Sequence, residues 1–165
     1  MFELKPLTTE AIPKALERAD RYRLLNEAAE AESICLDILT ADPENQRALV
    51  TLILALSDQF GQQRFSVGEH RVEDFVSRLR DEYERTYYRG VVCERRAKAA
   101  FSTHLRAADA YEWFREAMVW YEKAESIRPA GNDDAVLRWN TCARIFAHNR
   151  YLQPREEERA EPYLE

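Results

Sequence analysis

Glycine and proline are scarce in this chain, which has four glycines and six prolines among its 165 residues. Most of the prolines stand near the ends of the chain or between segments with helical patterns. This depletion, together with a charged content of 33%, favours an all-α protein. A length of 165 residues with an apolar content of 45% is enough for one hydrophobic core but too little for two ordinary domains.

Long apolar runs are also missing. The longest covers Ala48–Leu56, is interrupted by Thr51 and is too short to span a bilayer. The N-terminal residues lack the block of consecutive apolar side chains that a signal peptide needs. We therefore expect a soluble, cytoplasmic protein with no membrane partner.

The chain has no surplus of basic residues, since its formal net charge is −6. Contact with phosphates needs a basic surface, so we expect no nucleic-acid partner. One local basic group remains, formed by Arg89, Arg95, Arg96 and Lys98. It would suit an anion or an acidic partner, but ion pairing within one helix is the simpler explanation.

Close cysteine pairs are absent: Cys35, Cys93 and Cys142 stand far apart, and no CxxC motif occurs. An odd number of distant cysteines is typical of free thiols in a reducing compartment. Each lies in an apolar helical pattern, which favours a buried small side chain. Cys93, near Arg95 and Arg96, is the one candidate for a thiol of lowered pKa.

Catalytic and metal-binding motifs are missing as well. The sequence has no HExxH, no P-loop and no GxGxxG, and His70, His104 and His148 lie on different predicted elements without ligand spacing. The 30 acidic residues include no pair that the sequence singles out for acid–base chemistry. We expect no enzymatic activity, no metal and no cofactor.

Apolar residues recur at helical spacing through most of the chain. The inward stripe of the first segment is expected to contain Leu16, Ala19, Tyr22 and either Leu25 or Asn26. The third segment is apolar nearly all round, which predicts a central place in the fold. A loop is expected at 61–68, and Asp109 is expected to cap the sixth helix. The expected helices cover about 9–25, 27–40, 43–59, 69–84, 85–107 and 109–127, with a last one from a cap at Asn132 or Asp133 to about 149.

The segment 85–107 contains no proline, and Gly90 is its only helix breaker. One long helix is the preferred interpretation, because an isolated glycine costs about 1 kcal/mol without forbidding a helix. A break near Gly90 is the alternative.

Two stretches end with the same spacing of small, large and proline residues. Ala31, Cys35, Ile38 and Pro43 form the first, and Ala117, Tyr121, Ala124 and Pro129 form the second. This spacing resembles the closing half of the tetratricopeptide repeat, in which two antiparallel helices form a hairpin that stacks on its neighbours. Tyr22 stands at the matching aromatic position of the first unit.

The resemblance covers residues 10–149 and departs from the family in places. Ala15 and Arg18 stand where the family has Trp and Leu. The second repeat is interrupted by the segment 61–68. It implies a right-handed stack of about three hairpins plus a C-terminal capping helix, within a domain of residues 1–149 followed by a polar tail, 150–165. A generic helical bundle is the alternative.

The family binds a protein or peptide along a concave surface lined by the first helix of each hairpin. The resemblance therefore implies a non-enzymatic interaction module or scaffold, whose basic groove residues would pair with an acidic peptide or a C-terminal carboxylate. Leu16 and Asp20 replace the Lys and Asn of the family's carboxylate clamp, which disfavours a chaperone-tail ligand. An ordinary solvated surface is the simpler explanation for any one of these positions. The register places Asp20, Arg23, Arg47, Ser57, Asp58, Ser102 and Arg106 on that surface.

Other functions stay open at the level of sequence. A small-ligand sensor or enzyme would use a pocket between the long hairpin and the cap, with Arg96, His104 or Tyr111. A homodimer is a further alternative, because short arrays often bury exposed faces against a second copy. Aromatic residues are expected in the core, and any that are exposed would anchor a partner. These aromatic residues are Tyr83, Tyr87, Tyr88, Trp113 and Trp120.

Overall fold

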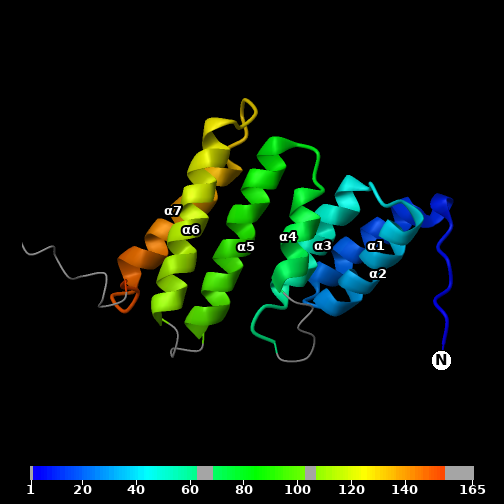
Figure 1. Cartoon of the computed structure of the whole chain (residues 1–165), viewed down its shortest axis with the longest axis horizontal. Coiled ribbons are helices and arrows are strands. Elements are labelled where there is room, and N and C mark those ends of the chain that lie inside the picture. Colours follow the sequence, from blue (N-terminus) through cyan, green and yellow to red (C-terminus); the bar gives the residue numbers. More distant parts are fainter. Residues whose placement is uncertain (1, 63–68, 103–106, 155–165) are drawn as a thin grey trace, which may run out of the picture. The chain divides into compact units, whose positions relative to one another are not determined.

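The computed structural model describes residues 2–62, 69–102 and 107–154, and these are helical apart from turns and short connections (Figure 1). The described ranges contain no strand, so the all-α prediction is confirmed. None of their helices is both long and apolar enough to cross a membrane. The helices are a 3₁₀ turn at Thr9–Ala11, α1 (Ile12–Leu24), α2 (Ala28–Ala41), α3 (Gln46–Asp58), α4 (Glu69–Ser77), α5 (Glu82–Ser102), α6 (Ala107–Ser126) and α7 (Asp134–His148).

The chain divides into two compact units, residues 1–88 and 89–165, and α5 runs through the boundary. In the first unit α2 packs against α1 and α3, and α3 also contacts α1 and α4. Small side chains allow this close packing, since Ala19, Ala31 and Ala48 are fully buried. The apolar α3 touches the other three helices of this unit, as its pattern predicts.

The helix α3 begins later than the sequence predicts. Pro43 was expected to open the helix, but α3 starts at Gln46 because Asn45 caps it. The Asn45 side chain accepts a hydrogen bond of 2.9 Å from the backbone N–H of Ala48 and donates one of 3.0 Å to Asp42. Pro43 therefore lies in the turn that joins α2 to α3.

The predicted helix over 69–84 is wrong in its second half. The helix α4 ends at Ser77, and a new helix begins at Glu82. Asp81 caps that helix by accepting a hydrogen bond of 2.8 Å from the N–H of Glu84. The Arg85 guanidinium donates to the carbonyls of Leu79 and Arg80, both at 2.7 Å, and so satisfies backbone groups in the break.

The long helix α5 is continuous through Gly90, as preferred, and its described part ends at Ser102. The predicted end at about Ala107 is wrong, because α6 begins at Ala107. Asp109 is not the cap of α6, because the helix begins at Ala107 and Asp109 lies in its first turn. An acidic side chain is favourable there, since the first turn carries the positive end of the helix dipole.

The second unit is held by aromatic and small residues of α6 and α7, which pack together. The Phe146 ring meets Tyr111 and Phe114 edge to face, with centroid distances of 5.4 and 5.9 Å. Asn132 rather than Asp133 supplies the side-chain bond at the start of α7, accepting at 3.0 Å from the Asp134 N–H. Of the predicted tail, 155–165 lies outside the described residues.

Candidate functional site

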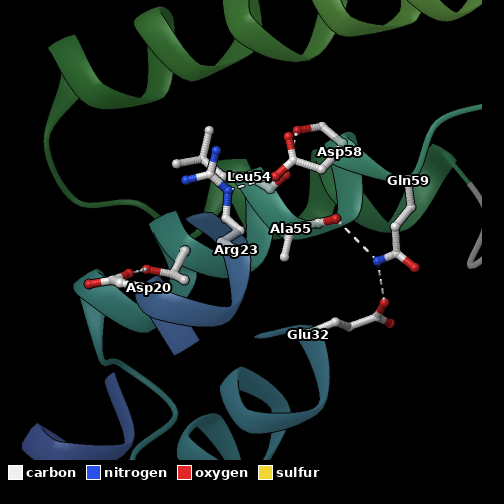
Figure 2. Close-up of polar contacts among 9 residues, drawn as sticks. Asp20, Arg23, Glu32, Leu54, Ala55, Asp58 and Gln59 are labelled. Carbon is white, nitrogen blue, oxygen red and sulfur yellow. Dashed lines mark hydrogen bonds and ion pairs between the residues drawn. The ribbon is translucent and has the colours of Figure 1, made fainter. Parts of the chain in front are cut away.

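Five of the seven predicted groove residues lie on α1 and α3, which contact each other in the first unit. Four of them form two ion pairs between these helices. The Arg47 Nη2 and Asp20 Oδ2 atoms are 2.6 Å apart, and the Arg23 Nε and Asp58 Oδ2 atoms are also 2.6 Å apart. Figure 2 shows the Arg23 guanidinium reaching from α1 to Asp58 on α3. We call the surface formed by Asp20, Arg23, Arg47 and Asp58 the α1–α3 face.

The two ion pairs differ in their exposure to water. The side chains of Arg23 and Asp58 are 23% and 27% exposed, whereas those of Arg47 and Asp20 are 57% and 39% exposed. Asp20 also accepts a hydrogen bond of 2.9 Å from the Thr51 hydroxyl. Each arginine of this face is therefore matched by an aspartate of the same face, so the face carries no surplus of positive charge.

The other three predicted residues do not join these pairs. Ser57 is buried, and its hydroxyl donates to the Leu54 carbonyl of its own helix at 3.0 Å. Ser102 lies at the end of α5 in the second unit, where it donates to the Ala99 carbonyl at 2.8 Å. Arg106 lies outside the described residues.

A hollow of about 460 Å³ adjoins the Arg23–Asp58 pair, and we call it the corner hollow. It is bounded by the end of α1, the start of α2 and the end of α3. Its wall combines charged and amide groups with small and apolar side chains. The lining residues are Arg23, Leu24, Asn26, Glu27, Ala28, Ala29, Asp58, Gln59 and Gln62.

The end of α1 explains the shape of this corner. The N–H of Glu27 donates to Tyr22 O at 2.9 Å, and the N–H of Asn26 donates to Arg23 O at 3.1 Å. Asn26 adopts a φ of 61°, which completes a Schellman turn. The turn leaves Leu24 81% exposed and Leu25 59% exposed. The expectation that Leu25 or Asn26 faces inward is therefore wrong, because both are exposed.

The far wall of the corner hollow is fixed by Gln59, which follows α3. Its side-chain amide donates to Glu32 Oε2 on α2 at 2.8 Å and to the Ala55 carbonyl at 3.1 Å (Figure 2). These bonds tie the start of α2 to the end of α3. The hollow therefore exists as a preformed feature rather than one that a ligand must open.

Sequence reasoning missed Leu24 and Glu27 in this site. The available signal was the pair Leu24–Leu25 followed by Asn26, because two adjacent leucines at a helix end cannot both face one core. The turn that exposes both depends on the positive φ of Asn26.

A second group of charged residues lies in the second unit around Glu94, whose side chain is fully buried. Its Oε2 accepts a hydrogen bond of 2.6 Å from the Tyr121 hydroxyl, and its Oε1 accepts from Lys98 and, at 3.3 Å, from Arg138. Burial, reinforced by the Glu94 carboxylate, holds the pKa of the Tyr121 hydroxyl far above its usual value. We call these four residues the Glu94 cluster.

Burial keeps the thiols of Cys35 and Cys142 from ionising easily. Burial is the largest cause that raises the pKa of Cys35 to about 12 and the pKa of Cys142 to about 12, so both are protonated at neutral pH. Cys93, the reactive candidate, is buried as well. Cys35 and Cys142 therefore pack as small apolar side chains.

Two arginines of α5 stack on tryptophans of α6. The Arg89 guanidinium lies 5.3 Å from the Trp120 ring centroid, and that of Arg96 lies 4.8 Å from the Trp113 centroid. Tyr83 and Tyr87 stack on each other in the first unit at 5.8 Å. The aromatic residues are thus largely used in packing.

The alternative pocket residues have separate surroundings. Arg96 stacks on Trp113, Tyr111 packs against Phe146, and His104 lies outside the described residues. Within the described ranges, no group of three or more His, Cys, Asp and Glu side chains could hold a metal ion.

No protein-family model matches the chain, and neither a curated protein nor a solved structure matches it.

Proposed function

We propose that this chain is a non-enzymatic interaction module that binds a protein or peptide along the α1–α3 face. The hairpins would stack in the right-handed manner of tetratricopeptide repeats, with α1 and α3 as the first helices of consecutive hairpins. The observation that carries the proposal is the corner hollow at the end of this face, with Leu24 81% exposed beside it.

Several features of the face favour recognition. The ion pair with Asp58 orients the partly buried Arg23, so little side-chain entropy of Arg23 is lost when a partner binds. Leu24 and Leu25 supply apolar area that water covers in the isolated chain. A preformed hollow beside exposed leucines suits an anchor side chain of a partner.

Affinity capture from a native lysate tests the proposal with two matched variants. Leu24→Gln removes the exposed leucine at the hollow, and Leu137→Gln removes a leucine of α7 that is 62% exposed. Both changes keep a good helix former, add no charge and leave the core intact. We expect one set of proteins to be captured by the parent chain and by Leu137→Gln, and to be depleted with Leu24→Gln.

The result that overturns the proposal is equal capture by both variants, or no specific capture by the parent chain. Light scattering on the purified chain tests whether the α1–α3 face binds a second copy of the chain instead of another protein. If the mass is that of a dimer and Leu24→Gln reduces it to a monomer, the face binds itself.

A further inference from the structure

The corner hollow has an uneven charge. Its wall contains one arginine, Arg23, but two carboxylates, Asp58 and Glu27. Arg23 lies 2.6 Å from Asp58 and is oriented by it. Glu27 is therefore the charge of this wall that the Arg23–Asp58 pair leaves unbalanced.

Glu27 presents an exposed charge at the start of α2. It stands at the N-cap of α2, yet its side chain makes no capping hydrogen bond. It is exposed, and its carboxylate has no ion-pair partner within 2–62, 69–102 and 107–154. A negative charge at this end of α2 is favourable for the helix dipole, and the exposed carboxylate stays accessible to a cationic partner.

The apolar part of the wall lies next to this carboxylate in the sequence. Leu24 precedes Glu27 across the Schellman turn, and Ala28 and Ala29 follow it. A lysine or arginine side chain combines a long apolar stem with a cationic head. Its stem would cover Leu24 while its head reaches Glu27.

We propose that the partner inserts a lysine or arginine side chain into the corner hollow, with its charge at Glu27 and its stem against Leu24. This inference rests on the proposed function and specifies the chemistry of the partner. An acidic partner residue is disfavoured, because it would meet Glu27 and Asp58 while Arg23 is already held by Asp58.

The test uses an array of synthetic peptides. Each peptide sequence occurs in three versions that differ only at one central position, which is Lys, Gln or Glu. Binding of the full chain is measured at low and at high salt. We expect the Lys versions to bind at least about fivefold more tightly than the Glu versions at low salt, and this preference to shrink at high salt.

Two charge-reversal variants test whether Glu27 causes the preference for Lys over Glu peptides. Glu27→Lys should reverse it, whereas Glu30→Lys should leave it unchanged. Glu30 is a matched control because it is an exposed glutamate in the first turn of α2 that does not line the hollow.

Three results overturn the inference: the Glu versions bind as well as the Lys versions, the salt dependence is absent, or the two reversals act equally. If peptides bind without charge preference and Leu24→Gln weakens them, the proposed function stands and only the basic anchor is lost. If no peptide binds above an unrelated control protein, both proposals fail.

Discussion

The Tyr121 ring occupies the space beside Gly90 where any other residue would place its Cβ atom. A Cβ built on Gly90 would lie 2.6 Å from Cε1 and 2.7 Å from Cδ1 of that ring. The close approach brings the Tyr121 hydroxyl to Glu94, one helical turn along α5. Gly90, the expected helix breaker, is therefore a packing position inside a continuous helix.

Gly90→Ala should destabilise the second unit although alanine is the better helix former. Alanine gains about 1 kcal/mol in helix propensity, but displacement of a fully buried ring costs about 1–3 kcal/mol and pulls the hydroxyl from Glu94. We expect a net loss of stability in urea unfolding followed by tryptophan fluorescence, since Trp113 and Trp120 report on this unit.

In a variant that lacks the Tyr121 ring, Gly90→Ala should raise the free energy of unfolding instead of lowering it. In Tyr121→Leu, the change Gly90→Ala meets no aromatic ring, so only the gain in helix propensity remains. A loss of stability from Gly90→Ala in both backgrounds would show that the ring is not its cause.

Tyr121→Phe should cost about 1.5–3 kcal/mol, because it removes a hydrogen bond to a buried carboxylate while keeping the ring. Tyr111→Phe is the matched control on the same helix, since Tyr111 is partly exposed and packs through its ring. The same urea experiment compares them, and equal losses would contradict the assigned role of the Tyr121 hydroxyl.

Stability should fall as the solution becomes alkaline, and the buried thiols should contribute. Cys35 and Cys142 have a pKa of about 12 in the folded chain and about 9 when exposed. Their contribution is fully present below about pH 9 and is lost as the pH rises toward 12, at up to about 1.4 kcal/mol per pH unit for each thiol. Urea midpoints measured across this range give the slope.

The double variant Cys35→Ala, Cys142→Ala isolates the thiols. Loss of packing lowers its stability equally at every pH, but its slope above about pH 9 should be shallower than that of the parent chain. Identical slopes would show that these thiols ionise as easily in the folded chain as in the unfolded one.

The two ion pairs of the α1–α3 face should differ in their contribution to stability. Arg23→Ala, in the less exposed pair, should cost about 1 kcal/mol, and Arg47→Ala less than about 0.5 kcal/mol. Exchanging the partners of the first pair, by Arg23→Asp with Asp58→Arg, should recover part of the loss. Thermal unfolding measures all three, and equal costs for the two alanine variants would contradict this ranking.

The helices were largely predictable because apolar residues repeat with the helical period. Their ends were less so: Val72, Val76, Leu79 and Tyr83 keep that period across the break between α4 and α5. The break is made by the Asp81 cap and by the backbone bonds of Arg85, which periodicity does not report.

The candidate site was predictable only in part. The resemblance to a helical repeat predicted that Asp20, Arg23, Arg47 and Asp58 share one surface, but it did not predict which of them form ion pairs. Partners such as Arg23 and Asp58 are far apart in the sequence. Their mutual neutralisation depends on how α1 lies against α3. The role that we propose for Glu27 depends on its exposed side chain making no capping hydrogen bond, which the sequence does not report.

Gly90 and the Glu94 cluster also limit which substitutions this sequence can accept during evolution. Gly90 cannot become larger unless residue 121 becomes smaller, and a smaller residue 121 leaves Glu94 without its neutral donor. Loss of Glu94 in turn deprives Arg138 of its carboxylate. These four positions should therefore change together among descendants of a common ancestor, and their covariation would record the contact between α5, α6 and α7.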